Sequence, residues 1–365
     1  MSKQQTLINQ LAREELVDMV PYQSARRLFA SADSQVDNIW LNANEAPGSG
    51  DYRVNAQNIN RYPDFQPDNL MQAYSQYTSL EANQLLATRG ADEGIELVIK
   101  AFCRAYQDSI LICPPTYGMY AISAQAQGVG IVKVPQIDNQ LDIDGIKAQV
   151  GKVKVVFLCS PGNPTGNLLD KAQIEQTIEL FQDNAIVVVD EAYIEFSAQD
   201  TVQGLLEKYD NLIVLRTLSK AFGLAGLRCG FTLANPAIIT MLSKVIAPYP
   251  ISAPVAEIAS AALNQEGLAV MRTNVEQSNA LRTSLSQWLY EQTWCVRVLP
   301  SHANFVLFEC VDKDAIFNAL KDQNILIRDQ SSQLQLANCL RISIGSESEL
   351  NLLKNVLETR FSNAS

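Results

Sequence analysis

Short apolar segments without polar alternation recur through the middle of the chain. Five of them lie at residues 109–113, 130–134, 153–159, 185–190 and 212–215. They have the length of strands, and the lack of alternation indicates burial on both faces of a sheet. Helical segments separate them, so the pattern predicts an α/β domain built on a large, mostly parallel sheet.

The pattern changes after about residue 248. A long helical segment through 272–290 precedes strands at 295–299, 304–309, 325–328 and 340–344, which alternate more strongly. These features predict a smaller α+β domain at 251–365, following a large domain at 46–250. The N-terminal segment, 1–45, begins as a helix and is expected to pack with the small domain.

Composition narrows the possible functions. The 365 residues carry a net charge of −11, which argues against nucleic acid and anionic membranes as partners. No apolar run reaches the roughly 18 residues of a membrane helix, and the N-terminus lacks the apolar segment of a secretory signal. The seven cysteines form no C-x-x-C pair, and we expect them to be free thiols. Free thiols are typical of a reducing compartment, which predicts a cytoplasmic protein.

Only one histidine, His302, is present, which argues against a Ser-His-Asp triad and against a metal site with several histidine ligands. We therefore predict no metal. His302 itself precedes a predicted strand and is more readily explained as a structural residue.

Polar residues follow several of the predicted strands directly. In a parallel sheet, ligands bind at the carboxyl ends of the strands, so these residues are the candidates for a site. They are Tyr117, Asn163, Asp190, Tyr193, Thr217, Ser219 and Lys220. Each has a simpler alternative, such as helix capping for Asp190 or core packing for Tyr117. Their shared position at strand ends is harder to explain in that way.

Lys220 carries the most specific chemistry. A lysine at the mouth of a buried strand is poorly solvated, which favours the neutral amine that forms Schiff bases. Ser219 and Arg228 flank it with a hydroxyl and a cation suited to a phosphate. The loop before Ala91 and Asp92 enters a helix whose N-terminus could hold the same phosphate. A Schiff-base lysine with a phosphate clamp is what pyridoxal 5'-phosphate (PLP) requires.

Beyond these residues, the chain resembles the fold-type I PLP-dependent aminotransferases, most narrowly the histidinol-phosphate aminotransferases. The segments that carry the resemblance span nearly the whole chain in the expected order. They are P-Y-Q-S-A-R-R (21–27), L-N-A-N-E (41–45), R-Y-P-D (61–64), R-G-A-D-E-G-I-E (89–96), C-P-P-T-Y-G-M-Y (113–120), S-P-G-N-P-T-G (160–166), D-E-A-Y-I-E-F (190–196), R-T-L-S-K-A-F-G-L-A-G-L-R-C-G-F (216–231) and L-R-I-S-I-G (340–345). The turn at 46–50, A-P-G-S-G, departs from the family pattern and leaves the conformation of that loop open.

The resemblance implies a three-layer fold and a role for each candidate. Lys220, Asp190 and Tyr193 would be catalytic. The cofactor would also contact Ala91, Asp92, Tyr117, Asn163, Thr217, Ser219, Arg228 and, from the other subunit of a homodimer, Tyr62. The substrate would contact Tyr22, Asn163, Arg328 and Arg341. The implied substrates are L-histidinol phosphate and 2-oxoglutarate, giving imidazole-acetol phosphate and glutamate in histidine biosynthesis.

Three alternatives stay open from the sequence. A threonine-phosphate decarboxylase would also bind an amino phosphate, and an aminotransferase of aromatic amino acids or aspartate would share the fold. A PLP-sensing transcription regulator would need a basic DNA-binding module, and neither end of the chain has one. Dinucleotide binding is disfavoured, because the glycine-rich segment after Lys220 lacks the spacing G-x-G-x-x-G.

Overall fold

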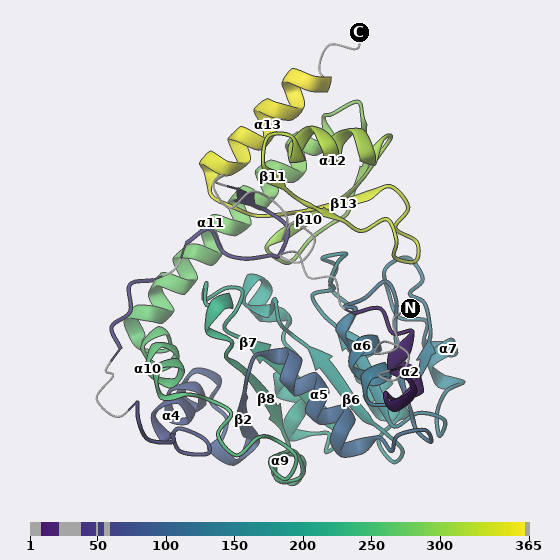
Figure 1. Ribbon diagram of the computed structural model, residues 1–365, viewed down its shortest axis with the longest axis vertical. Helices are drawn as coiled ribbons and strands as arrows, with labels where there is room; N and C mark the ends of the chain where they lie inside the picture. The colour runs from purple at the N-terminus through teal and green to yellow at the C-terminus, as the bar shows by residue number, and fades with distance from the viewer. Residues whose placement is uncertain (1–8, 22–37, 49, 55–58, 362–365) are drawn as a thin grey trace.

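The computed structural model describes residues 9–21, 38–48, 50–54 and 59–361, which form a large and a small unit (Figure 1). The large unit is built on a seven-stranded sheet with strand order β2-β8-β7-β6-β5-β3-β4. In that order the strands are Leu85–Thr88, Gly230–Ala234, Leu212–Thr217, Ile186–Asp190, Val155–Cys159, Ser109–Ile112 and Gly130–Lys133. All pairs are parallel except those of β8, which is antiparallel to both β2 and β7.

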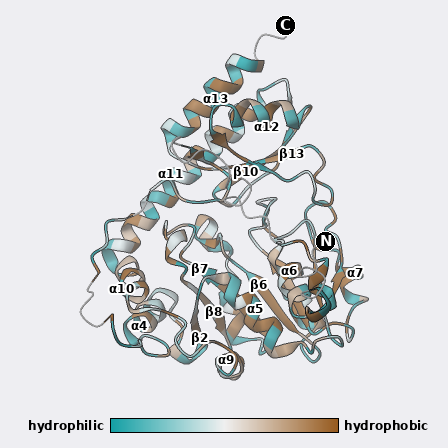
Figure 2. Ribbon diagram, viewed as in Figure 1, coloured by the Kyte–Doolittle hydropathy of each residue, from teal (hydrophilic) through white to brown (hydrophobic). Residues whose placement is uncertain are grey.

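Both faces of this sheet are covered by helices because successive strand residues point to opposite faces. In β6, Val187 and Val189 pack in one core cluster and Val188 packs in the other. The first cluster includes residues of α4 (Asp68–Thr78), α8 (Lys171–Leu180) and α10 (Ala253–Ala262). The second includes α5 (Ala91–Phe102), α6 (Met119–Ala126) and α9 (Pro236–Ser243). The result is the predicted three-layer α/β architecture, with the apolar strands in its middle (Figure 2).

The small unit contains an antiparallel sheet with strand order β12-β13-β10-β9. These strands are Arg328–Asp329, Cys339–Ser343, Phe305–Cys310 and Cys295–Val298. Helices α12 (Lys313–Lys321) and α13 (Glu347–Phe361) pack with this sheet. A separate parallel pair joins β1 (Ile39–Trp40) to β11 (Ile325–Leu326), so this part of the N-terminal segment packs with the small unit. Helix α2 (Glu14–Val17) contacts α6 of the large unit instead.

A 26-residue helix, α11 (Gln265–Tyr290), connects the two units (Figure 1). Its Met271 and Val275 pack in a core cluster of the large sheet, whereas Leu285 and Leu289 pack in the core of the small unit. Helix α10 also packs against α4 of the large unit, although it follows the predicted boundary at residue 250. The exact domain limits therefore remain predictions.

Short elements complete the described chain. They are α2 (Glu14–Val17), α7 (Ile143–Lys147) and four 3₁₀ helices, Ala82–Gln84, Ile194–Asp200, Gln203–Glu207 and Ala225–Leu227. In the part of the chain that the structure describes, no helix is both long and apolar enough to cross a membrane.

Two features of the large sheet differ from the expectation. Strands β2 and β8 were not predicted, and β4 is an edge strand whose Gly130 and Lys133 are exposed rather than buried. The apolar run of β4 therefore overstated its burial, whereas β2, at the other edge of the sheet, is buried throughout.

Candidate active site

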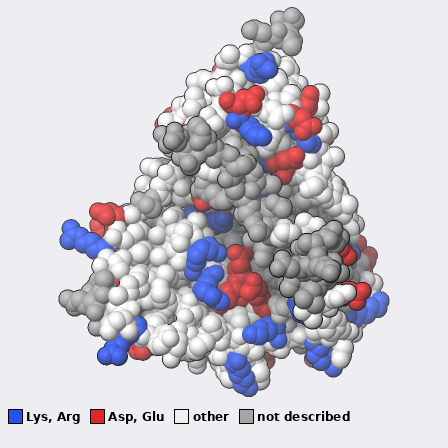
Figure 3. Space-filling view, viewed as in Figure 1, with Lys and Arg blue, Asp and Glu red and all other residues white. Residues whose placement is uncertain are grey.

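A cavity of about 650 Å³ lies at the carboxyl ends of β6 and β7 and extends to the small unit. Figure 3 shows charged side chains of both signs gathered near the hollow between the two units. Most of the predicted site residues line this one cavity. They are Ala91, Asp92, Tyr117, Asn163, Asp190, Tyr193, Thr217, Ser219, Lys220, Arg228, Arg328 and Arg341.

Lys220 lies three residues after the end of β7 and is half-buried in the cavity. Its Nζ donates a hydrogen bond of 3.1 Å to the carbonyl oxygen of Ala43 and lies 5.6 Å from the ring centre of Tyr193. Burial, aided by the positive charge of Arg341, lowers the pKa of Lys220 to about 8. A larger fraction of this amine than of an ordinary lysine is therefore neutral and nucleophilic near neutral pH.

Asp190 is the last residue of β6, and its carboxylate is buried. Oδ2 accepts a hydrogen bond of 2.6 Å from the hydroxyl of Tyr120, and Oδ1 accepts one of 3.1 Å from the backbone N–H of Ala192. Burial raises the pKa of Asp190 to about 6 even though both hydrogen bonds act in the opposite direction. Such a carboxylate is suited to pairing with a cationic group that enters the cavity.

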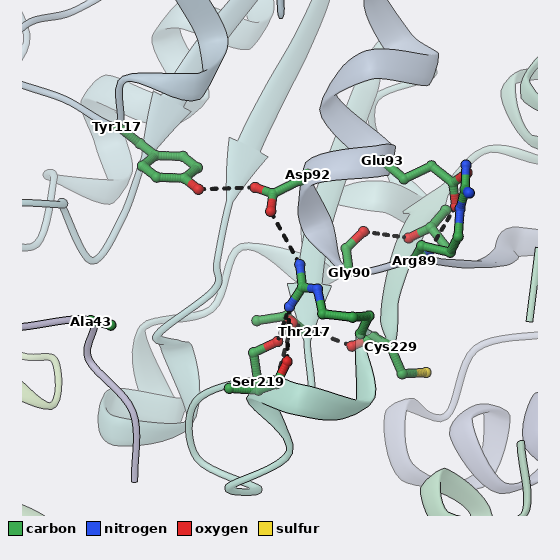
Figure 4. Close-up of polar contacts among 12 residues, drawn as sticks. Ala43, Arg89, Gly90, Asp92, Glu93, Tyr117, Thr217, Ser219 and Cys229 are labelled. Carbon is green, nitrogen blue, oxygen red and sulfur yellow. Dashed lines mark hydrogen bonds and ion pairs between the residues drawn. The ribbon is translucent and has the colours of Figure 1, made fainter. Parts of the chain in front are cut away.

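One end of the cavity has the features of a phosphate site. The guanidinium of Arg228 donates to Ser219 Oγ at 3.2 Å and to Asp92 Oδ2 at 3.2 Å, and Asp92 in turn accepts a hydrogen bond of 3.0 Å from Tyr117 (Figure 4). Helix α5 begins here at Ala91, so its free N–H groups and positive dipole end are at the same place.

The backbone around this end is closely packed. A Cβ on Gly90, where φ is +78°, would come within 2.7 Å of Arg228 NH2, and a Cβ on Gly230 would come within 2.7 Å of the Ala91 nitrogen. Glycine is therefore needed at both positions for the helix N-terminus and the guanidinium to stand together. A serine hydroxyl, a guanidinium and a helix N-terminus fit a phosphate ester.

A second cationic site lies on the small unit. Arg328 and Arg341 are direct partners across the antiparallel pair β12–β13 and so lie side by side. NH1 of Arg341 donates to Asn163 Oδ1 at 2.6 Å, NH2 donates to the Asn42 carbonyl at 3.1 Å, and the guanidinium lies 5.0 Å from the ring centre of Phe305. The cavity thus offers separate anion sites at its two ends, with Lys220 also in its lining.

Comparison with known proteins agrees with this geometry. Residues 25–357 match the family described as Aminotransferase class I and II. The chain belongs to this family. It is 63% identical to a histidinol-phosphate aminotransferase from Colwellia psychrerythraea, over 97% of this chain and 100% of that protein. It is 50% identical to the enzyme of the same name from Yersinia enterocolitica, over 95% of this chain and 91% of that protein.

Solved structures give the same fold. The histidinol-phosphate aminotransferase from Sinorhizobium meliloti, in complex with pyridoxal-5'-phosphate, has a TM-score of 0.85 at 24% identity, covering 96% of this chain and 97% of that one. The enzyme from Clostridium acetobutylicum has a TM-score of 0.78 at 25% identity, covering 84% and 92%. The predicted fold-type I aminotransferase architecture is confirmed.

Several residues of this aminotransferase site were not assigned from the sequence. Asn44 and Asn42, in the quoted segment L-N-A-N-E, contact Tyr193 and Arg341. Tyr120 contacts Asp190 from α6, and Gln330 and Gln333 line the cavity beside Arg328. No local signal points to Tyr120, because its partner is 70 residues away.

Two predicted residues are not among those that line the cavity. Tyr22 lies outside the described residues. Tyr62 lies on the surface, is 81% exposed, and stacks on Tyr249 with ring centres 4.5 Å apart.

The loop at 46–50, which departs from the family pattern, packs on the glycine-rich segment after Lys220. The Gly48 carbonyl oxygen lies 2.8 Å from the point where a Cβ on Gly223 would stand.

The described residues contain no cluster of His, Cys, Asp and Glu that could hold a metal ion. His302 is not among the lining residues; its backbone N–H donates to the Gly166 carbonyl at 2.7 Å.

Proposed function

We propose that the protein is a PLP-dependent aminotransferase that moves the amino group of L-histidinol phosphate to 2-oxoglutarate in histidine biosynthesis. The observation that carries the choice of substrate is the 63% identity to a histidinol-phosphate aminotransferase over the full length of that protein. The choice of cofactor is supported by a cavity that combines Lys220, a buried carboxylate and a phosphate site.

In this proposal, the phosphate end of the cavity holds the phosphate of PLP. Ser219, Arg228 and the backbone N–H groups at Ala91 would bind it, and the amine of Lys220 would attach to the carbonyl carbon of the cofactor with release of one water. Asp190 would pair with the pyridine nitrogen, Tyr193 and Asn163 would bind the ring oxygen, and Tyr117 would contact the ring. When bound, PLP supplies an electron sink for the substrate carbon that carries the amino group.

Lys220 also moves the proton. Its Nζ lies in the cavity lining and would be the group that accepts the proton from the amino-bearing carbon of the substrate and later donates it back. Burial, which lowers the pKa of Lys220 to about 8, favours the neutral form that can accept this proton. His302 does not line the cavity, so it is no competitor for this role.

Arg341 and Arg328 bind the anion of the substrate. L-Histidinol phosphate carries a phosphate and no carboxylate, whereas 2-oxoglutarate carries two carboxylates, so the same cations must accept either group. The planar fork of arginine can bind two oxygens of a phosphate or of a carboxylate, which explains how one site serves both half-reactions.

The exposed Tyr62 supports a homodimer with shared active sites. Its ring lies on the surface and is not in the lining of the cavity of its own chain, which is compatible with the role in a partner's site that the family resemblance implies. A cytoplasmic location is part of the proposal, supported by seven free cysteines.

An absorbance titration tests the proposal. Purified protein loaded with PLP is titrated with L-histidinol phosphate and then with 2-oxoglutarate. We expect the visible band of the lysine-linked cofactor to disappear with the first and to return with the second. A band that does not respond to L-histidinol phosphate, together with release of carbon dioxide from L-threonine phosphate, would instead identify a decarboxylase.

A further inference from the structure

Three consecutive residues of the N-terminal segment each contact a different side chain of the cavity. The Asn42 carbonyl accepts a hydrogen bond from Arg341, the Ala43 carbonyl accepts one from Lys220, and Asn44 Nδ2 donates one of 2.9 Å to the hydroxyl of Tyr193. The first two contacts use only backbone atoms. Asn44 is the one that contributes a specific side chain.

The orientation of the Asn44 amide follows from its other partner, Ser343. The backbone N–H of Asn44 donates to Ser343 Oγ at 2.8 Å, and Ser343 Oγ donates its proton to Asn44 Oδ1 at 3.1 Å. Ser343 is fully buried and its proton has no other acceptor among the hydrogen bonds of the described residues, so the amide oxygen of Asn44 faces Ser343 and the amide nitrogen faces Tyr193.

A similar argument orients Asn163. The guanidinium of Arg341 can only donate, so the group that it contacts at 2.6 Å must be the amide oxygen of Asn163. The amide nitrogen of Asn163 then donates to the Tyr193 hydroxyl at 3.1 Å. Tyr193 therefore accepts hydrogen bonds from two amides at once.

A hydroxyl has one proton and two accepting lone pairs. With both lone pairs of Tyr193 used by Asn44 and Asn163, its proton must point in a third direction, and Tyr193 is buried except where it lines the cavity. We infer that Asn44 is a positioning residue that, together with Asn163, directs the Tyr193 proton into the cavity towards the ring oxygen of the cofactor. The inference rests on the proposed function and adds a residue to it.

The backbone at Asn44 limits which substitutions are informative. Its φ is +53°, a conformation that Asn, Asp and Gly tolerate best. Asn44→Asp replaces the donating amide by an acceptor, which attracts the Tyr193 proton away from the cavity. Asn44→Gly removes the amide without adding an acid, and keeps the backbone contacts to Ser343 Oγ and Asn304 Nδ2.

The test is the pH at which the visible absorbance of the PLP-loaded protein changes, measured for wild type, Asn44→Asp, Asn44→Gly, Tyr193→Phe and the two double variants. A hydrogen bond donated to the ring oxygen stabilises its anionic form, so its loss should raise this pH by about one unit. We expect that shift in Tyr193→Phe and Asn44→Asp, and a smaller shift in the same direction in Asn44→Gly.

The double variants separate this role from a general effect of charge or folding. If Asn44 acts through Tyr193, its substitutions should shift the absorbance much less when Tyr193 is already Phe. Equal shifts in both backgrounds, or no shift in either Asn44 variant, would overturn the inference.

Asn324→Asp is the matched control, because Asn324 has φ +60° and is exposed. This variant should leave the pH of the absorbance change as it is in wild type. A wild-type protein without any lysine-linked band would instead contradict the proposed function.

Discussion

The hydroxyl of Tyr120 donates a hydrogen bond of 2.6 Å to Oδ2 of Asp190, and both side chains are buried. Tyr120 is held in place by stacking on Phe157, with ring centres 4.8 Å apart. The bond stabilises the ionised form of Asp190, whereas burial raises its pKa to about 6. Tyr120 therefore helps keep a buried carboxylate charged at neutral pH.

Removing this hydroxyl should move the pH dependence of cofactor binding. Tyr120→Phe should raise the pKa of Asp190 by about one further unit, the size expected for a lost hydrogen bond to a charged group. Because pairing with the pyridine nitrogen needs the ionised carboxylate, PLP affinity of the apoprotein should then fall, as the pH is lowered, about one unit earlier than in wild type. Tyr209→Phe, which removes a hydroxyl bonded to Glu175 and Glu179 outside the cavity, is the control. Identical binding profiles for Tyr120→Phe and wild type would contradict this role.

Attachment of PLP to the apoprotein should depend on the protonation of Lys220. Its pKa is lowered to about 8, so the rate of attachment should rise with pH up to about 8 and then level off. Arg341→Gln removes a positive charge that lowers this pKa, so the profile should move to higher pH. Stopped-flow absorbance after mixing with PLP measures the rate. A rate independent of pH between 6 and 10 would be inconsistent with Lys220 as the reacting amine.

Arg341→Lys should weaken both substrates. Lysine cannot bind two oxygens in parallel, and losing one charge-assisted hydrogen bond should raise the apparent KM for L-histidinol phosphate and for 2-oxoglutarate about tenfold or more. Arg297→Lys in β9, which changes an exposed pair with Glu309, is the control and should leave both KM values unchanged. An Arg341→Lys variant with normal KM for both substrates would refute the assignment.

Gly90→Ala should impair the phosphate site. The added methyl group would meet Arg228 NH2 at 2.7 Å, at a position where φ is +78°. Gly151→Ala is a matched control, because Gly151 also has φ +78° but would meet nothing within 4 Å. Both variants should lose about 1 kcal/mol of stability from the strained backbone. Only Gly90→Ala should weaken PLP binding, measured by titrating the apoprotein.

Mixing two inactive variants should reveal whether Tyr62 serves the active site of a partner. Lys220→Ala and Tyr62→Ala chains, unfolded and refolded together, would form mixed dimers in which one site has both an intact lysine and an intact tyrosine. We expect activity to exceed that of either variant refolded alone. No recovery, with mixed dimers present by mass spectrometry, would place Tyr62 in the site of its own chain or in none.

Local pattern predicted five of the seven strands of the large sheet and missed β2 and β8. The apolar runs at 153–159, 185–190 and 212–215 are central strands of the sheet. Helices cover both faces of these strands, so their side chains are apolar on both faces. Strand β8 was missed because its sequence, G-F-T-L-A, directly follows a glycine-rich segment and reads as its continuation. Strand β2 is only four residues long and was read as part of the loop before α5.

The sequence alone determined which residues stand at the ends of the central strands, and therefore that Asp190, Tyr193, Ser219 and Lys220 would share one edge of the sheet. This followed from short-range pattern and from a general rule about parallel sheets. Only the tertiary structure decided what these side chains contact. Lys220 reaches the Ala43 carbonyl 177 residues away, and Asn44 reaches Ser343 299 residues away. Such contacts depend on how two units and the N-terminal segment pack together, and no spacing within one segment encodes that arrangement.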